Sequence, residues 1–374
     1  MIRLQAITLR EIRLPLREPF RISSGTVSER RIALLEFRDA SGLTSWSECV
    51  AGEFPNYSPE TIDTAWIAIT QWLAPRVLQR DVAAPGAVRS LLDQDLRGHN
   101  MSKAAVEMGI WGLEATRLGM PLSRLLGGTR SEIDVGISLG IQASPLALVQ
   151  RIAGALAEGY RKVKIKIMPG SDLEFLRAAR EAAGPDAPLM ADANNAYTLD
   201  DAERLAQLDE LDLMMIEQPL AFDDLVRHAE LQRRLRTPIC LDESITSLER
   251  AQDMVTLGSG RIVNIKPGRV GGLATSIAIH DFCESNAIPV WCGGMLESGI
   301  GRAYNVALAS LPNFVKPGDV SPSARYWERD IVTPEWTMTP RGTITVPNGA
   351  GLGVDIDLDR IDNLTVRREV VEGG

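Results

Sequence analysis

The chain has 374 residues, 45% of them hydrophobic, and carries a formal net charge of −9 at pH 7. This length suffices for a large core, and we expect two domains. The acidic balance, without a long basic run, argues against nucleic acid and anionic membranes as partners. No apolar stretch has the length of a membrane span, and the first residues lack the apolar core of a signal peptide, so we expect a cytoplasmic protein.

The four cysteines are far apart in the sequence and lie mostly in apolar segments. They are Cys49, Cys240, Cys283 and Cys292. This distribution favours reduced thiols in the core over disulfides or a zinc cluster.

Residues 1–60 alternate between apolar and polar side chains in the manner of β-strands. We predict a hairpin with its turn near residues 39–42, and a polar loop at 19–30. Three helical patterns follow. They cover residues 61–78, 84–98 and 102–119, the first with Ser58 or Thr61 as its N-cap. Together these elements predict an α+β capping domain over residues 1–125, which the turn-rich tail at about 340–374 rejoins.

Apolar strands alternate with amphipathic helices through the rest of the chain. The expected strands cover residues 133–141, 162–168, 188–193, 213–218, 238–243, 262–267 and 289–294, with an irregular eighth strand within 317–331. A repeat of about 25 residues corresponds to one strand, one helix and two short loops, the unit of a parallel barrel. We therefore predict a (β/α)7β barrel of the modified TIM type over residues 126–339.

A polar residue closes six of these strands. In order they are Lys166, Asp192, Glu217, Asp242, Lys266 and Glu297, at intervals of 24 to 26 residues and a last interval of 31. Any one of them could simply mark where a strand reaches water. The first five share the same phase of successive units, however, and place two ammonium groups and three carboxylates at the barrel face where active sites lie. So many charges must pair or bind a metal there, which indicates a shared catalytic site.

Strand parity refines this site, because residues two apart in a strand share a face. Lys162, Lys164 and Lys166 therefore point into the barrel. We expect Lys162 to be a solvated residue at the bottom, Lys164 to be intermediate and Lys166 to lie at the mouth. By the same rule Asn194 shares a face with Asp192.

Three carboxylates offer only oxygen ligands, which suit Mg²⁺ or Mn²⁺ better than zinc. A divalent ion there could hold a substrate carboxylate and stabilise an enediolate, the anion left when a proton leaves the adjacent carbon. Lys166 can act as the base if Lys164 and the metal lower its pKa, and Lys266 would face the substrate from the opposite side. A histidine base is not expected, because His99, His228 and His280 all lie in helical patterns.

The motifs KVKIK, DANNAY, IEQPL, LDES, NIKPGRVGG and CGGMLESGIG occur in this order. In this respect the whole chain resembles the enolase superfamily, in its muconate-lactonizing subgroup. It is most similar to the N-succinylamino acid (N-acylamino acid) racemases and the o-succinylbenzoate synthases. The resemblance implies that Asp192, Glu217 and Asp242 bind the metal, Mg²⁺ or another divalent ion. It also implies that Lys166 and Lys266 are the acid/base pair, with Lys164 as the first lysine of the family's KxK pattern.

The remote part of a small carboxylate substrate must meet other groups, because the strand ends hold only its carboxylate and reacting carbon. We expect these contacts in the capping loops at 20–30 and 51–58 and at the ends of the first, third and seventh strands. The candidate residues are Phe20, Ser24, Tyr57, Ser138, Asn194, Gly293, Gly294 and Met295. On the alternative interpretation the capping-loop residues are merely solvated.

The expected activity is racemisation of N-succinyl or other N-acylamino acids by 1,1-proton transfer through an enediolate, together with o-succinylbenzoate synthesis. We also expect a homo-oligomer, from a dimer to an octamer. One alternative is o-succinylbenzoate synthesis as the main role, in menaquinone biosynthesis. Another is a dipeptide epimerase, although Asp319-Val320-Ser321 departs from that group's Asp-x-Asp motif. A catalytically silent binding barrel is the non-enzyme alternative, but it would not need two opposed lysines.

Overall fold

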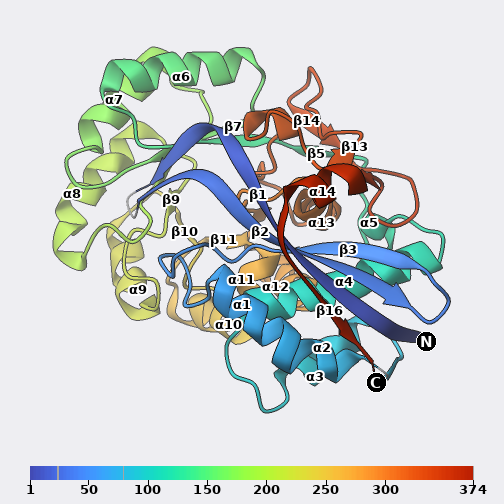
Figure 1. The fold of residues 1–374 in the computed structure, drawn as a ribbon. Coiled ribbons are helices and arrows are strands. Elements are labelled where there is room, and N and C mark those ends of the chain that lie inside the picture. The colour runs from blue at the N-terminus through green and yellow to red at the C-terminus, as the bar shows by residue number, and fades with distance from the viewer. Residues whose placement is uncertain (23–24, 79, 374) are drawn as a thin grey trace.

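The structure, a computed structural model, describes residues 1–22, 25–78 and 80–373. An antiparallel sheet with its own helices lies against one end of a barrel of parallel strands (Figure 1). Within the described residues, no helix combines the length and hydropathy that a membrane span needs.

The N-terminal sheet has the order β16-β1-β2-β3, and β4 pairs with the start of β1. Its strands are β1 (Ile2–Ile22), β2 (Gly25–Asp39), β3 (Thr44–Cys49), β4 (Asp81–Val82) and β16 (Thr365–Glu372). The predicted turn between β2 and β3 is confirmed. Asp39 fixes it by accepting hydrogen bonds from the backbone N–H groups of Ser41 and Leu43 at 2.8 and 3.0 Å. The C-terminal strand β16 pairs with β1, so the two ends of the chain meet in one sheet.

The predicted loop at residues 19–30 is wrong over most of its length, because β1 and β2 continue as a long hairpin arm. Their pairing shifts register between Pro15 and Phe20 and then resumes through Arg21, opposite Thr26. Ile141 donates its backbone N–H to Arg21 O at 3.1 Å, so the arm reaches across to the barrel (Figure 1). An arm with water on most of its surface needs no apolar face, which is why its sequence reads as a loop.

Helices follow β3 in the N-terminal part, and the longest of them contacts both this sheet and the barrel. They are α1 (Ile62–Ile67), the π-helical η1 (Ala68–Leu73), α2 (Ala74–Val77), η2 (Pro85–Ala87), α3 (Val88–Asp93), α4 (Asn100–Arg117) and α5 (Leu122–Leu125). Of the two predicted caps for the first helix, the structure uses Thr61, in a capping box with Thr64. α4 packs close to the sheet, because a Cβ at Gly109 would overlap the ring of Phe37.

Seven parallel strands form the barrel sheet, in the order β12-β11-β10-β9-β8-β7-β6. They are β6 (Gly136–Leu139), β7 (Lys162–Lys166), β8 (Leu189–Asp192), β9 (Ile216–Glu217), β10 (Ile239–Leu241), β11 (Ile262–Ile265) and β12 (Val290–Cys292). The expected first strand is split, because β5 (Glu132–Asp134) instead pairs with β14 (Thr343–Thr345).

The eighth position of the barrel is filled by an irregular segment, as expected. Phe314 bridges to Val290 of β12, and Gly318 bridges to Val135 beside β6. Asp319 donates its backbone N–H to Cys292 O at 2.9 Å, and Gly136 donates to Gly318 O at 2.6 Å. This segment therefore links the two edges of the curled sheet.

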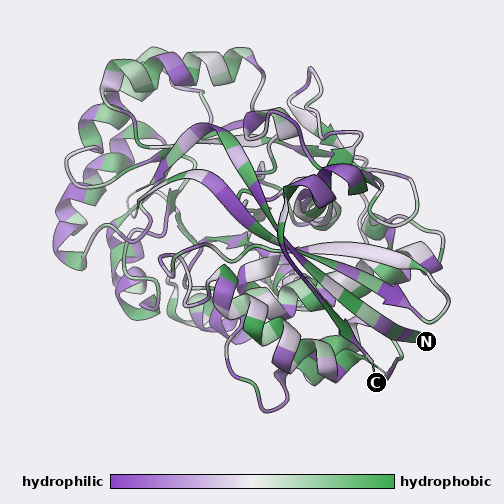
Figure 2. Ribbon diagram, viewed as in Figure 1, coloured by the Kyte–Doolittle hydropathy of each residue, from purple (hydrophilic) through white to green (hydrophobic). Residues whose placement is uncertain are grey.

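Helices cover the outside of the barrel, and hydrophobic and hydrophilic residues alternate along α6 to α9 (Figure 2). The helical elements are α6 (Pro145–Ala157), α7 (Leu173–Ala183), η3 (Leu199–Asp201), α8 (Ala202–Ala206), η4 (Gln207–Leu211), α9 (Leu225–Arg234), α10 (Leu248–Leu257), α11 (Pro267–Val270), α12 (Leu273–Ser285) and α13 (Gly299–Ala309). After them come η5 (Ser323–Arg325), β13 (Val332–Thr333), β15 (Asp355–Ile356) and α14 (Leu358–Leu364). All four cysteines are buried and free, which confirms the expectation of core thiols.

Two buried carboxylates of the N-terminal part cap helices of the barrel. Glu107 on α4 accepts the backbone N–H groups of Leu273 and Ala274, at 2.6 and 2.8 Å, at the start of α12. Glu48 on β3 does the same at α13, where it accepts from Ser298 N at 3.0 Å. α12 starts at a glycine, which has no side chain to cap it, so the carboxylate from the other unit satisfies its free N–H groups.

Replacing Glu107 by Gln should destabilise the fold by about 1–3 kcal/mol, because the amide turns a donor toward one of the two N–H groups. Burial raises the pKa of Glu107 to about 7, from 4.5. The folded state therefore binds the Glu107 proton more tightly than the unfolded state does. The stabilisation of the fold that follows is present in full below about pH 4.5 and is lost as the pH rises through 7. The deficit of the variant, measured by urea unfolding, should thus shrink between pH 5 and 8.

The matched control is Glu181→Gln, at an exposed position of α7, which should change neither the stability nor its pH dependence. A deficit in Glu107→Gln that grows with pH would contradict this account of the interface.

Candidate active site

The structure brings the five predicted strand-end residues together as buried ion pairs. Lys166 Nζ lies 2.6 Å from Asp192 Oδ2, and Lys266 Nζ lies 2.7 Å from Asp242 Oδ2. The three carboxylates are at most 1% exposed, and the third, Glu217, is completely buried. Parallel strands end at the same edge of a sheet, so the spacing seen in the sequence becomes proximity in space.

Lys164 lies beneath these five residues and contacts two of their carboxylates. Its Nζ is 3.2 Å from Asp192 Oδ2 and 3.2 Å from Glu217 Oε2. Glu217 also accepts a hydrogen bond from Asn264 Nδ2 at 2.7 Å. Burial, and after it the charge of Asp192, raises the pKa of Glu217. Burial would also raise the pKa of Asp192, but Lys166 and Lys164 outweigh it and hold that pKa below its usual value.

The two lysines at the mouth differ in their electrostatics. Burial lowers the pKa of Lys166, and the charge of Lys164 adds to this, so the pKa stays below its usual value despite the attraction of Asp192. This is the direction expected for a base. Burial acts on Lys266 in the same sense, but Tyr57 and nearby carboxylates outweigh it and raise the pKa.

The prediction that Lys162 is solvated is wrong. Lys162 has no exposed surface, its Nζ lies 3.4 Å from the ring centre of Trp291, and Asp319 Oδ1 is 3.0 Å away. Trp291 comes from β12 and Asp319 from the irregular eighth segment, so side chains of other strands close the barrel beneath the site. Parity within one strand shows that a residue points inward but not what covers it.

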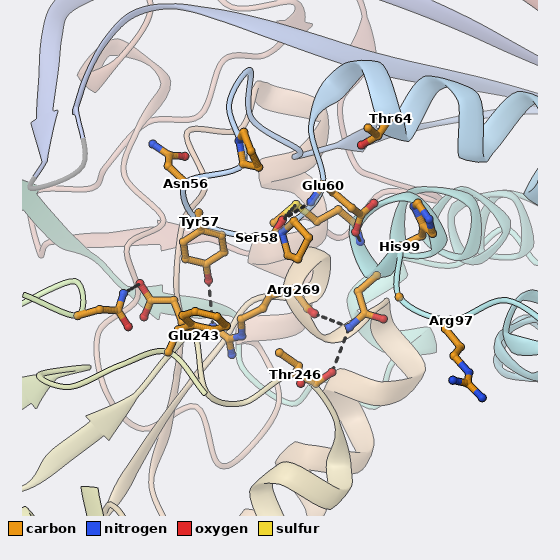
Figure 3. Close-up of a pocket in the computed structure, with 17 residues that line it drawn as sticks. Asn56, Tyr57, Ser58, Glu60, Thr64, Arg97, His99, Glu243, Thr246 and Arg269 are labelled. Carbon is orange, nitrogen blue, oxygen red and sulfur yellow. Dashed lines mark hydrogen bonds between the residues drawn. The ribbon is translucent and has the colours of Figure 1, made fainter. Parts of the chain in front are cut away.

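Tyr57 of the capping loop reaches the strand ends. Its hydroxyl donates to Asp242 Oδ1 at 2.9 Å, and Lys266 Nζ lies 4.5 Å from its ring centre. Arg269 on α11 also contacts Asp242 and donates Nε–H to Ile245 O at 2.7 Å. Figure 3 shows the Tyr57 hydroxyl directed toward Arg269. Sequence reasoning missed Arg269, whose signal was its place in PGRVGG, three residues after Lys266.

A cavity of about 820 Å³ opens beside this group (Figure 3). Its walls come from the capping loop around Tyr57, from the start of α4, and from the ends of β8, β9 and β10, with Glu243 and Phe222 among the lining residues. Neither catalytic candidate, Lys166 or Lys266, lines it. The cavity therefore lies next to the lysine pair, on the side of the capping loop.

The other predicted substrate contacts fall at different places. Asn194 accepts a hydrogen bond from Lys166 Nζ at 2.6 Å. Ser138 faces the same way as Lys164, its partner across β6 and β7. A Cβ at Gly293 would lie 2.6 Å from Lys266 Cε, so only glycine allows this close approach. A Cβ at Gly294 would lie 2.7 Å from the backbone oxygen of Asp319.

The remaining candidates include Met295, which lines a small cavity together with Lys266. Met295 packs against the core of the N-terminal part, and Phe20 is half-buried on the hairpin arm, opposite Val27. Ser24 lies outside the described residues. Glu297 takes no part in the ion pairs, because it accepts from Met295 N and Asn305 Nδ2, both at 2.9 Å. Substrate contacts by these residues stay predictions.

The oxygen-only donor set of Asp192, Glu217 and Asp242 could hold Mg²⁺ or Mn²⁺. In the part of the chain that the structure describes, these three carboxylates do not form a group whose possible ligand atoms all lie within 4.8 Å of one another. Among the described residues, His280, Asp281 and Glu284 form such a group, with possible ligand atoms within 4.8 Å of one another. It is the weaker candidate, because His280 already accepts from Asn313 N and contacts Asp281, and both carboxylates are exposed.

Comparisons with known proteins show the family of the chain. Residues 5–127 match the family model "Mandelate racemase / muconate lactonizing enzyme, N-terminal domain", and residues 147–360 match "Enolase C-terminal domain-like". The chain is 49% identical to an o-succinylbenzoate synthase of Geobacillus kaustophilus over 97% of this chain and 96% of that one. It is 47% identical to an N-succinylamino acid racemase of Thermus thermophilus, over 98% of both chains.

A solved structure gives the same result for the fold. An enolase-superfamily protein from Listeria innocua superposes with a TM-score of 0.97 at 38% identity, over 100% of both chains. Both named relatives are enzymes, and this chain is an enzyme with the same fold. The chain belongs to the enolase superfamily, with both domains of its mandelate racemase/muconate lactonizing enzyme family.

Proposed function

We propose that the protein racemises N-succinylamino acids by moving the α-proton between Lys166 and Lys266, and that the same residues carry out o-succinylbenzoate synthesis. The pairing of two buried lysines with carboxylates at strand ends four strands apart, on β7 and after β11, is the observation that supports this most. The relatives named above bear both activities in their names.

Asp192, Glu217 and Asp242 would hold a divalent metal, which supplies positive charge to offset the anion formed at the substrate. Neutral Lys166 takes the α-proton from one face, and the Lys266 ammonium gives a proton to the other face. Proton exchange with water then restores both lysines. In the synthase reaction the proton taken from carbon ends on the departing β-hydroxyl, which leaves as water, while the second lysine remains an ammonium cation.

The dipeptide epimerase alternative is disfavoured by the groups that would have to grip a free amino group. Asp319 is buried against Lys162 and Lys164, at 3.0 and 2.6 Å. Ser321, in place of a second aspartate, donates to Gly136 O at 3.0 Å. Neither side chain is free for a ligand. The two lysine–carboxylate pairs also disfavour a barrel that only binds a ligand without catalysis, since binding alone requires no acid/base pair.

The first test concerns the metal. Glu217→Gln should lose about a hundredfold or more in kcat/KM and should no longer show an Mg²⁺-dependent rise in melting temperature, because a ligand bound only by the folded state stabilises it. Glu297→Gln is the matched control, since Glu297 is also a buried carboxylate after a barrel strand, but with backbone and amide partners. An Mg²⁺ response that survives in Glu217→Gln and disappears in Glu297→Gln would refute the ligand assignment.

The second test concerns the two lysines and uses α-proton exchange in heavy water. The family resemblance assigns Lys166 to the S side and Lys266 to the R side. Lys266→Ala should therefore abolish racemisation but keep exchange of the S enantiomer, and Lys166→Ala should do the reverse. Each of the two variants serves as the control for the other. Loss or retention of exchange for both enantiomers in both variants would contradict opposed single bases.

The third test concerns the substrate. Binding remote from the reacting carbon helps to position it, so kcat/KM for an apolar amino acid should be highest for the N-succinyl form, lower for N-acetyl, and about tenfold or more lower for the free form. A preference for the free form or for dipeptides would overturn the racemase assignment. A much higher kcat/KM for synthesis of o-succinylbenzoate would make the synthase the main activity, with menaquinone biosynthesis as its role.

A further inference from the structure

A line of alternating charges runs through the barrel beneath the candidate active site. It begins at the ring of Trp291, over which Lys162 Nζ lies at 3.4 Å, and continues through Asp319 to Lys164. Lys162, Asp319 and Lys164 are 0, 6 and 4% exposed, so water screens these charges little. The mechanism proposed above uses neither Lys162 nor Asp319.

Lys164 is shared between carboxylates on two sides. Above it are Asp192 and Glu217, each with an oxygen 3.2 Å from Nζ. Below it is Asp319, whose Oδ2 is closer, at 2.6 Å. A divalent cation that takes Asp192 and Glu217 must therefore take them from Lys164. Removing the carboxylate partners of a buried ammonium is strongly unfavourable unless another partner stays.

The position of Asp319 is fixed independently of Lys164. Its backbone N–H donates to Cys292 O at 2.9 Å, and its backbone oxygen lies against Gly294, where no Cβ would fit. Its other oxygen, Oδ1, lies 3.0 Å from Lys162, which the ring of Trp291 covers. Asp319 is therefore a rigid anion that keeps its place whatever happens at the mouth.

We propose that Asp319 is a positioning residue that retains Lys164 when a divalent cation takes Asp192 and Glu217, and so determines the affinity of the site for that cation. This rests on the metal ligands of the proposed function. Without the charge of Asp319, Lys164 has the two metal-ligand carboxylates as its anionic partners, and the cation must displace it from both. Lys162 holds Asp319 in place but does not compete for the ligands.

The experiment measures Mn²⁺ affinity without substrate, by electron paramagnetic resonance of the free ion, for the full-length wild type and for Asp319→Asn. The variant should bind Mn²⁺ about tenfold or more weakly. In a Lys164→Met background, where no ammonium competes, adding Asp319→Asn should change the affinity by less than about twofold. Unchanged affinity in Asp319→Asn would overturn the proposal. Equal weakening in both backgrounds would also overturn it, since the charge of Asp319 would then act directly on the cation.

Two further arms keep the test decisive. If Asp319→Asn alone does not fold, Lys162→Met/Asp319→Asn removes the charge together with its lysine partner, and the same tenfold weakening is expected. Lys162→Met alone should keep the affinity within about threefold, and a tenfold loss there would contradict the division of roles. If the wild type binds no Mn²⁺, the proposed metal site itself is refuted. If the wild type binds Mn²⁺ and Asp319→Asn binds it equally well, only the role of Asp319 is refuted.

Discussion

The mutual neutralisation of buried charges at the barrel mouth and beneath it is the constraint on which the rest of the structure depends. The cations are Lys162, Lys164, Lys166, Lys266 and Arg269, and the anions that pair with them are Asp192, Glu217, Asp242 and Asp319. An unpaired charge at such a depth costs far more than a typical contact contributes. The barrel strands and the segments between them must therefore deliver each side chain to its partners. The regular barrel, with a similar unit repeated around an axis, is what makes this delivery possible.

Much of this arrangement could be predicted from the sequence, because it follows from periodicity. The interval of about 25 residues indicated the barrel, and the placement of Lys166, Asp192 and Glu217 at the same phase indicated one shared site. Alternation within KVKIK correctly predicted that its lysines face inward. The repeat interval and the alternation can be recognised from the residues of the strands alone.

The parts that could not be predicted depend on contacts between distant segments. Lys162 looks solvated in isolation, and only Trp291 and Asp319, more than a hundred residues later, show that it is covered. Arg269 follows a strand end on a short helix and has no periodic signal. The hairpin arm around Phe20 lacks an apolar face because it does not pack as a sheet surface does. In each case the decisive partner comes from another element, which local pattern does not encode.

The helix caps supplied by Glu48 and Glu107 have a consequence for how this fold can diversify. Two barrel helices, α12 and α13, have their first N–H groups satisfied by carboxylates that belong to the other unit. A barrel joined to a foreign N-terminal sheet would keep its strands but leave these helix starts buried without acceptors. The unit that shapes the substrate's surroundings is thus also part of the barrel's own scaffold. New specificities are then more easily gained by changing residues in the capping loops than by exchanging the unit that carries them.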